Sequence, residues 1–224
     1  KASAFFVVYA TGTVAQSWFA WHPDSRTADD AAKNIPAYQR VGATAADHDT
    51  DGFPHYAEGD GTDNAWASVA TVDGSGSDKL THVTAVTKVS DAATGVVHEH
   101  GATVLSNVGT VMFQTATATD WSINAYAGVL PGALVASPYA APKTSVVAGV
   151  FDVSADLRQV HVDGVQKNTS NTDYGSGNFA NATLYVLSRA GTSLRFNGRF
   201  YGSTGRFGPM GASERNNLTR WWQK

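Results

Sequence analysis

A regular series of short apolar segments, each ended by turn residues, constrains the fold of this chain more than any other feature. From Ala65 onward, segments rich in Val, Thr, Ala and aromatic residues are separated mostly by Gly, Pro, Asn or Asp. Segments of this kind are typical of β-strands, whose side chains alternate between two faces. We therefore predict strands at 65–72, 79–88, 95–100, 108–117, 120–127, 145–152, 157–162, 165–169, 181–188 and 193–201.

The C-terminal stretch predicts a half-buried strand followed by a helix. Leu194, Phe196 and Phe200 fall on one side of a period-two pattern, and polar residues with a tyrosine fall on the other. Gly198 and Gly202 mark places where a strand bulges or another backbone approaches closely. Beyond this strand, an apolar stripe at helical spacing predicts a helix that lies on the sheet, carried by Leu218, Trp221 and Trp222.

About ten short strands and one terminal helix fit an all-β fold, a two-sheet antiparallel jelly-roll sandwich with a short C-terminal helix. The strongest local signal is Asp163-Gly164 between two alternating runs, which favours a two-residue type I′ hairpin. Near the N-terminus, Ala4–Ala10 and Ser17–Trp21 are strand candidates without clear alternation, as in strands covered on both faces. We divide the chain into an N-terminal arm, 1–45, and a jelly-roll domain, 46–224.

Composition excludes several classes of partner. Only 16% of the residues are charged, the net charge is −3 and no basic block exists, so we expect no nucleic acid partner. No apolar run reaches the roughly 20 residues that cross a bilayer, so we expect no membrane insertion. The chain has no cysteine and therefore needs no disulfide. Because it starts at Lys1 rather than Met, we expect a processed or excised part of a longer protein.

Residues 47–58 match the calcium-loop formula D-x-D-x-D-G-x5-E at every position. Carboxylates at alternate positions and a glycine for the sharp turn can surround a hard cation, which a closing glutamate binds through both oxygens. The predicted Ca²⁺ ligands are Asp47, Asp49, Asp51 and Glu58. The alternative is an Asp-rich surface loop built from Asx turns.

Aromatic residues beside amides or acids are candidates for glycan binding, because sugar C–H faces stack on rings while polar side chains bind the hydroxyls. Tyr174 lies in the polar loop 171–178, which we expect to be exposed. The alternative for each ring is packing in the core or at its rim. The candidates are Trp121 with Asp120 and Asn124, Tyr126, Tyr139, and Tyr174 with Asp173.

His98-Glu99-His100 has the composition of a metal or acid–base cluster. On a strand, His98 and His100 share one face and Glu99 points away. Two histidines can hold zinc with a third ligand, but the sequence identifies none, so we interpret this segment as a polar outer strand face. Glycoside hydrolysis normally needs two carboxyl groups about 5–10 Å apart, and the three glutamates, at 58, 99 and 214, form no such pattern.

Four segments, in this order, carry a resemblance to a known family. They are Gly52-Phe53-Pro54-His55-Tyr56 with 59–64, then 77–97, then 139–142 followed by 163–164, and finally 191–202 with the closing helix. Together they resemble the laminin-G-like, concanavalin A-like jelly-roll domains of bacteriophage and prophage proteins, which often end tail fibres or other virion surface proteins. The resemblance implies the fold, an extracellular place on the virion surface, and a homotrimer.

The function we predict is that of a non-enzymatic phage virion surface module, of the tail-fibre or receptor-binding type, which recognises host-surface polysaccharide. A first alternative is a structural decoration or fibre-tip protein that binds other virion proteins. A second is a glycan-degrading enzyme, which requires paired carboxylates or a Gln-His-Tyr cluster lining one groove.

Overall fold

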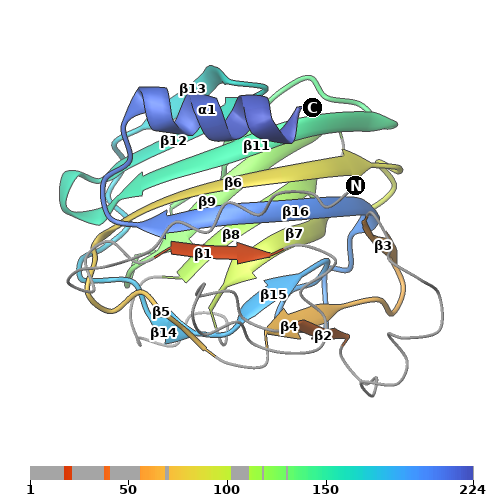
Figure 1. Cartoon of the computed structure of the whole chain (residues 1–224), viewed down its shortest axis with the longest axis horizontal. Coiled ribbons are helices and arrows are strands. Elements are labelled where there is room, and N and C mark those ends of the chain that lie inside the picture. Colours follow the sequence, from red (N-terminus) through yellow and green to blue (C-terminus); the bar gives the residue numbers. More distant parts are fainter. Residues whose placement is uncertain are drawn as a thin grey trace.

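The computed structural model describes residues 18–21, 38–40, 56–68, 71–101, 111–117, 119–129 and 131–223, with backbone alone for 18–21, 38–40 and 111–115. In these ranges two antiparallel β-sheets are stacked, and one helix lies outside them (Figure 1). None of the described helices is long and apolar enough to cross a membrane. The strand predicted at 4–10 and the calcium ligands predicted at 47, 49 and 51 lie outside the described residues.

The front sheet, nearer the viewer in Figure 1, has seven strands. They are β1 (Trp18–Trp21), β3 (Ala57–Asp60), β6 (Lys79–Lys88), β11 (Lys143–Asp152), β12 (Leu157–Val162), β13 (Val165–Ser170) and β16 (Asn197–Phe207). Their order is β1-β16-β6-β11-β12-β13. β3 and β1 pair with successive parts of β16, at 197–200 and 203–206, so they share one edge of that strand.

The back sheet also has seven strands. They are β2 (Tyr38–Arg40), β4 (Trp66–Ser68), β7 (Gly95–His100), β8 (Val111–Thr117), β9 (Asp120–Tyr126), β10 (Leu134–Ala136) and β15 (Leu184–Val186). Their order is β10-β9-β8-β7-β15-β4-β2, and a separate ribbon pairs β5 (Val72–Asp73) with β14 (Asn181–Ala182). A short 3-10 turn, Val153–Ala155, joins β11 to β12.

Most predicted strands are confirmed, and three of them, β6, β7 and β12, have the predicted bounds. The segments predicted at 65–72 and 181–188 each break into two shorter strands that belong to different sheets. The predicted strand at 17–21 is β1, which extends the front sheet, while β2 extends the back sheet. Parts of the N-terminal 45 residues therefore complete both sheets of the sandwich.

The hairpin between β12 and β13 has the predicted turn. Asp163 and Gly164 have φ values of 52° and 83°, the positive pair that a type I′ turn requires. The Asp163 carboxylate also accepts a hydrogen bond of 2.8 Å from the backbone N–H of Val146 on β11. The turn is thereby tied to the middle of the front sheet.

The last strand contains the predicted irregularities. Gly202 has a φ of 147° and lies where the pairing of β16 with β6 shifts register, so it belongs to a β-bulge. A Cβ on Gly198 would lie 2.1 Å from a backbone oxygen of β6, so only glycine allows this approach. Phe196 and Phe200 are buried as predicted, but the prediction for Leu194 is wrong. Leu194 is 40% exposed and has a φ of 44°, because it precedes the strand in an irregular loop.

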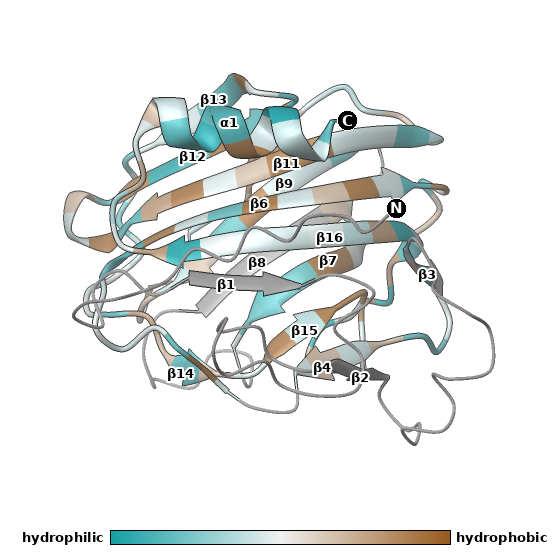
Figure 2. Cartoon of the chain, viewed as in Figure 1, coloured by the Kyte–Doolittle hydropathy of each residue, from teal (hydrophilic) through white to brown (hydrophobic). Residues whose placement is uncertain are grey.

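The terminal helix α1 (Ala212–Trp222) covers the outer face of the front sheet over β6 and β11 (Figure 1). Leu218 and Trp222 pack on an apolar outer cluster formed by Val83, Ala85, Val146 and Ala148. Arg206 at the end of β16 binds the carboxylate of Glu214 at 2.8 Å and anchors the start of the helix. Figure 2 shows brown bands on β6 and β11, the two strands that α1 contacts.

The main core lies between the two sheets and is rich in aromatic side chains. Phe179 contacts Phe207 with ring centroids 5.6 Å apart and Phe151 with centroids 6.4 Å apart. Burial of this apolar surface drives the stacking of the sheets. Other fully buried members of this core are Leu80, Val86, Val97, Trp121, Ile123, Val147, Val160, Tyr174, Leu184, Val186, Phe196 and Phe200.

Candidate functional site

Four polar side chains lie side by side on the outer face of the front sheet, one from each of four adjacent strands. Thr144 on β11 is opposite Thr87 on β6, Thr87 is opposite Arg199 on β16, and Arg199 is opposite Glu58 on β3. Neighbouring strands are about 4.8 Å apart, so the four residues span about 14 Å. We call them the polar row.

Hydrogen bonds connect the members of the polar row. The Thr87 hydroxyl is 2.7 Å from the Thr144 hydroxyl and 3.0 Å from the phenol oxygen of Tyr201. Arg199 Nε donates to Glu58 Oε1 at 3.1 Å. This bond raises the pKa of Arg199, so the guanidinium remains charged. The Arg199 and Glu58 side chains are 43% and 56% exposed, so a ligand in solution can reach both.

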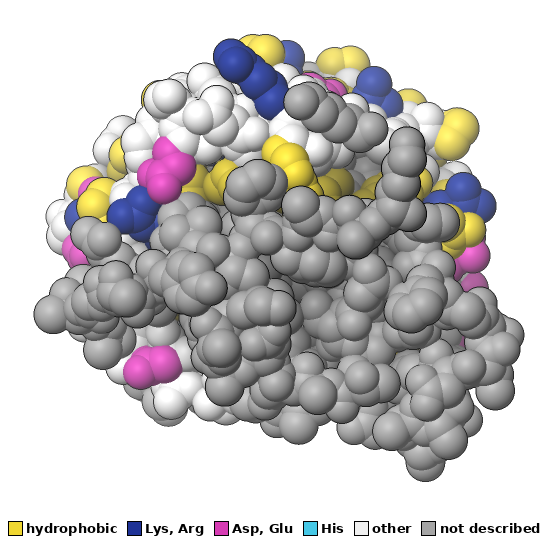
Figure 3. Space-filling model, in the orientation of Figure 1, with side chains coloured by type: hydrophobic (Ala, Val, Ile, Leu, Met, Phe, Trp, Pro, Cys, Tyr) yellow, Lys and Arg dark blue, Asp and Glu magenta, His cyan; other side chains and the backbone are white. Residues whose placement is uncertain are grey.

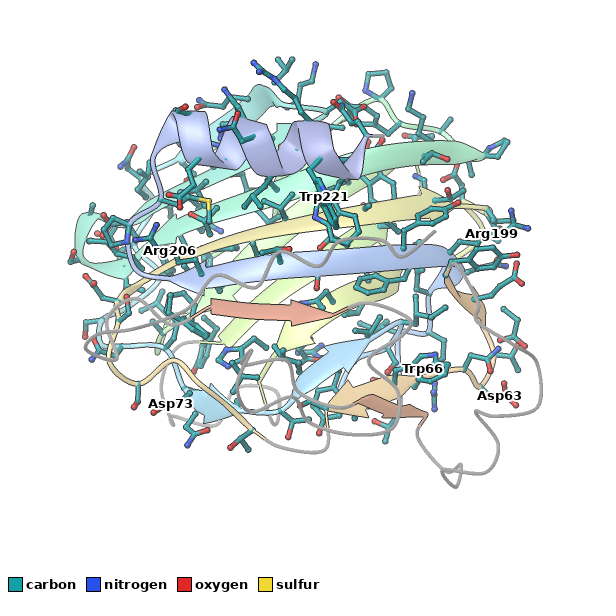
Figure 4. All side chains as sticks on the ribbon, viewed as in Figure 1. Asp63, Trp66, Asp73, Arg199, Arg206 and Trp221 are labelled. Carbon is teal, nitrogen blue, oxygen red and sulfur yellow. The ribbon has the colours of Figure 1, made fainter. Side chains whose placement is uncertain are left out.

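Two half-exposed tyrosines flank Arg199. The rings of Tyr56 and Tyr201 meet edge to face, with centroids 5.9 Å apart and an interplanar angle of 70°. The Arg199 guanidinium carbon is 4.9 Å from the Tyr56 ring centroid, a cation–π distance. At the right edge of Figure 3, basic, acidic and hydrophobic side chains lie next to one another, and tyrosine is coloured there as hydrophobic. Figure 4 labels Arg199 at this edge.

The β-bulge in β16 orients this surface. Phe200 pairs with Val86 and Gly202 pairs with Ala85, so Tyr201 is the extra residue of the bulge. A bulge of this kind re-aims a side chain and strengthens the local twist. Tyr201 thereby reaches the hydroxyl of Thr87 on the neighbouring strand.

Three predicted glycan-binding residues, Asp120, Trp121 and Tyr139, belong to one end of the sandwich. Trp121 is fully buried, and Lys88 Nζ lies 5.4 Å from its ring centroid. Lys88 is itself 1% exposed, pairs with Asp91 at 2.7 Å and lies 3.5 Å from the backbone oxygen of Asp120. Tyr139 is half-buried against the core. Trp121 therefore supports this end of the core and presents no ring face to solvent.

Two of the other predicted glycan residues, Asn124 and Tyr174, contact a second buried basic side chain. Arg158, 2% exposed, donates to Asn124 Oδ1 at 3.1 Å and lies 5.5 Å from the ring of Tyr174. The predicted exposure of Tyr174 is wrong: the ring is fully buried, and burial raises the pKa of its phenol. Asp173 is exposed and its carboxylate accepts a backbone N–H of its own loop at 2.8 Å, while Tyr126 is half-buried.

The structure describes only part of the predicted calcium loop. Asp47, Asp49 and Asp51 lie outside the described residues, and Glu58 is the polar-row carboxylate bonded to Arg199. Among the residues that the structure describes, no group of three or more His, Asp or Glu is placed to hold a metal ion. The Ca²⁺ site at 47–58 stays a prediction.

The segment His98-Glu99-His100 is fully buried, so the predicted polar outer face is wrong. His98 stacks on His82 of β6 with ring centroids 4.2 Å apart, and His100 contacts Phe207 with centroids 5.0 Å apart. We call His82, His98 and His100 the histidine cluster. The prediction that His98 and His100 share a face is confirmed, because both rings meet side chains of the front sheet.

Burial decides the protonation of this cluster. It lowers the pKa of His82 to about 3, that of His100 to about 4, and that of His98 well below the ordinary value. Burial raises the pKa of Glu99 to about 7, and Glu99 Oε2 accepts the backbone N–H of Ala190 at 2.8 Å. The histidines are therefore neutral packing groups at neutral pH.

Sequence reasoning missed the polar row, Tyr56, and the buried cations Lys88 and Arg158. The row was partly visible, because the period-two pattern of the last strand places Arg199 and Tyr201 on the outer side. Their partners come from β3, β6 and β11, and only the register between strands brings them together.

No protein-family model matches this sequence, and no curated protein matches it. Solved structures do match in fold. The heptameric SAP-like pentraxin of Limulus polyphemus aligns with a TM-score of 0.55 at 9% identity, over 72% of this chain and 80% of the pentraxin chain. Trypanosoma rangeli sialidase aligns with a TM-score of 0.54 at 15% identity, over 73% of this chain and 26% of the sialidase.

A botulinum neurotoxin type C structure aligns with a TM-score of 0.52 at 12% identity, over 75% of this chain and 42% of that chain. This chain therefore spans about a quarter of the sialidase and less than half of the neurotoxin chain. At such identities the likeness concerns the fold alone. The protein has an all-β, two-sheet antiparallel jelly-roll fold with a short C-terminal helix, as the sequence predicted.

Proposed function

We propose that this chain is a non-enzymatic glycan-binding module and that the polar row with its two tyrosines is the binding surface. The observation that carries the proposal is the exposed cluster of Tyr56, Arg199 and Tyr201 beside the hydroxyls of Thr87 and Thr144. Sugars are recognised by rings that stack on their C–H faces and by polar groups that bind their hydroxyls. The row offers both within about 14 Å.

The proteins of similar fold support this proposal. The neurotoxin structure concerns a toxin whose uptake by cells depends on interaction with two ganglioside molecules. The alignment with the sialidase covers only about a quarter of that enzyme, so the sialidase activity gives no support for a catalytic role of this chain. The three glutamates of this chain also occupy separate places: Glu58 on β3, Glu99 buried on β7 and Glu214 on α1. A retaining or inverting glycosidase normally needs two carboxyl groups about 5–10 Å apart, which no two of these glutamates provide. Glu58 has Asp60 two residues further along β3, but Glu58 is bonded to Arg199.

The proposal includes a virion setting. It rests on the ordered resemblance of four sequence segments to bacteriophage and prophage tail-fibre and surface domains. On a virion, several copies of a weak site act together, and avidity exceeds the affinity of one site. A homotrimer that binds host-surface polysaccharide is the arrangement we propose.

Glycan binding is tested with the purified protein on an array of bacterial polysaccharides, followed by calorimetry with each positive polymer. Arg199→Ala and Tyr201→Ala should each weaken binding at least about tenfold, because each removes a polar or stacking contact. Arg220→Ala, an exposed arginine on α1, is the matched control and should bind as the parent does. Binding that is unchanged in both row variants, or no binding to any polymer, contradicts the proposal.

Calcium bound by Asp47, Asp49, Asp51 and Glu58 is a separate proposal, because a Glu58 that binds the cation through both oxygens no longer accepts from Arg199. A thermal melt in calcium and in EDTA tests it, since a ligand of the native state raises the melting temperature. Asp49→Ala should abolish the rise. An identical melting temperature in both buffers contradicts a calcium site at 47–58 and leaves the polar row unaffected.

A further inference from the structure

We infer that the polar row selects uncharged sugars with adjacent hydroxyl groups and disfavours sugars that carry a carboxylate. This inference rests on the proposed glycan-binding function and names the class of ligand that the surface accepts. It follows from the hydrogen-bonding groups of the row and from the charges around it.

The row presents donors and acceptors beside one another. The Thr87 and Thr144 hydroxyls each donate and accept. Arg199 donates its Nε–H to Glu58 Oε1 and has further N–H groups on its two Nη atoms, while Glu58 has a second carboxylate oxygen. A sugar hydroxyl also donates and accepts, so two adjacent hydroxyls can bond to the guanidinium and to the carboxylate together. A carboxylate group can only accept, so of the two charged side chains in the row it could bond to Arg199 but not to Glu58.

The charges at this edge oppose an anion. Asp60 follows Glu58 by two residues on β3, and both are exposed while their neighbours in the strand are buried, so they share the outer face. The Asp60 carboxylate accepts the backbone N–H groups of Thr62 at 2.7 Å and Asp63 at 3.3 Å. The first of these bonds is the main cause that lowers the pKa of Asp60, which is therefore ionised at neutral pH.

The nearest exposed lysine does not offset these two carboxylates. Lys143 precedes Thr144 on β11, and alternation along a strand directs it to the opposite face. The described surface around the row therefore has two cations, Arg199 and Arg195, and Arg195 donates from Nη1 to the backbone oxygen of Asp63 at 2.8 Å. The exposed carboxylates there are three, Glu58, Asp60 and Asp63, so they still outnumber the cations. An acidic sugar that binds Arg199 must compete with Glu58 and approach Asp60, whereas a neutral sugar keeps the Arg199–Glu58 bond.

The expected selectivity is about tenfold in affinity, the size of an exposed charge interaction at these distances. It is measured with matched sugar pairs that differ only at one carbon: polymers of glucose, galactose or mannose against polymers of the corresponding uronic acids. All titrations are made in EDTA, so that no divalent cation neutralises the carboxylates. The neutral member of any pair that binds should bind more tightly, and its affinity should change little with added sodium chloride.

The double variant Glu58→Gln with Asp60→Asn should raise the affinity for uronic acid polymers about tenfold and reduce the selectivity to near unity. Glu214→Gln, on the helix at the far end of β16, is the matched control and should keep the parent's selectivity. Tighter binding of the uronic acid member, lost in Arg199→Ala, overturns this inference and leaves the proposed function standing. Binding of neither member of any pair overturns the proposed function itself.

Discussion

The polar row and the histidine cluster use similar chemical groups in opposite surroundings. Each combines aromatic rings with ionisable side chains. In the row, Arg199 and Glu58 are about half exposed and form an ion pair beside Tyr56. In the cluster, His82 and His98 are fully buried, stacked and neutral. The difference shows that solvent access decides whether such a group can serve a ligand or only the fold.

Strand β6 separates the two regions. It contributes His82 to the interior and Thr87 to the outer face, and the odd spacing of five positions places them on opposite sides of the sheet. The alternation of side chains along β6 therefore turns His82 toward His98 of the back sheet and places Thr87 beside Arg199 on the outer face. A change that acts on one face of β6 should leave the other face largely unaffected, which the following experiments test.

Acidification should produce the largest effect, and most of it should come from the histidine cluster, with a smaller contribution from His161, whose pKa burial lowers to about 4. The cluster has pKa values far below 6.5 in the folded state, so the unfolded chain binds protons that the folded chain cannot. Stability is full above pH 6.5 and falls as the pH decreases toward the folded values. Urea unfolding at pH 7, 6, 5 and 4 should show a net loss of several kcal/mol: each of the three histidines in the cluster loses on the order of 1.4 kcal/mol per pH unit below 6.5, and protonation of Glu99 offsets part of this loss. A stability that is flat down to pH 4.5 would contradict this account.

Replacing a buried aromatic residue should mainly reduce stability, whereas replacing an aromatic residue of the polar surface should mainly reduce glycan affinity. Trp121→Ala removes a fully buried ring and should reduce the free energy of unfolding by about 3–5 kcal/mol. Tyr201→Ala removes a half-exposed ring and should reduce it by about 1 kcal/mol, while glycan affinity falls at least tenfold. Urea unfolding and calorimetry on the same two variants give both readouts. If folded Trp121→Ala failed to bind glycan, the binding site would include Trp121, as the sequence predicted, and the polar row would not be the main site.

Local sequence signals predicted the elements that depend on local chemistry. The strands β6, β7 and β12 have the predicted bounds because apolar runs and turn residues mark both of their ends. The Asp163-Gly164 hairpin was predictable because few residue pairs adopt two successive positive φ angles. The terminal helix followed from its apolar spacing, with Leu218 and Trp222 on the outer cluster as expected.

The candidate site was largely beyond such signals. Glu58 and Arg199 are 141 positions apart, and only the pairing of β3 with β16 makes them neighbours. Burial could not be predicted from the sequence either, because an aromatic residue between polar neighbours has the same sequence pattern whether its ring faces the core, like that of Trp121, or the solvent. His98 was misassigned for the same reason: a polar residue in a strand suggests an outer face, yet this one stacks on another histidine inside the core.

Glu99→Gln should give a smaller effect of opposite pH dependence. The folded-state pKa of Glu99 is raised to about 7 from an ordinary 4.5, so its contribution to stability is present below pH 4.5 and is lost as the pH rises through 7. Gln keeps the acceptor for the N–H of Ala190 and carries no charge. The variant should exceed the parent by about 2–3 kcal/mol at pH 8 and match it at pH 4. Equal stabilities at pH 8, measured by urea unfolding, would show that the carboxylate is solvated.

Thr87→Val should give the smallest change in stability and test the outer face of β6 alone. Valine has nearly the shape of threonine and suits a strand, so the free energy of unfolding should change by less than about 0.5 kcal/mol. The hydroxyl bonds to Thr144 and Tyr201 are lost, so the tyrosine is held less firmly and glycan affinity should fall about fivefold. Thr169→Val, on the exposed edge strand β13, is the control. If Thr87→Val also shifted the acid unfolding of the histidine cluster, the two faces of β6 would be coupled, and the separation of binding surface from core would not hold.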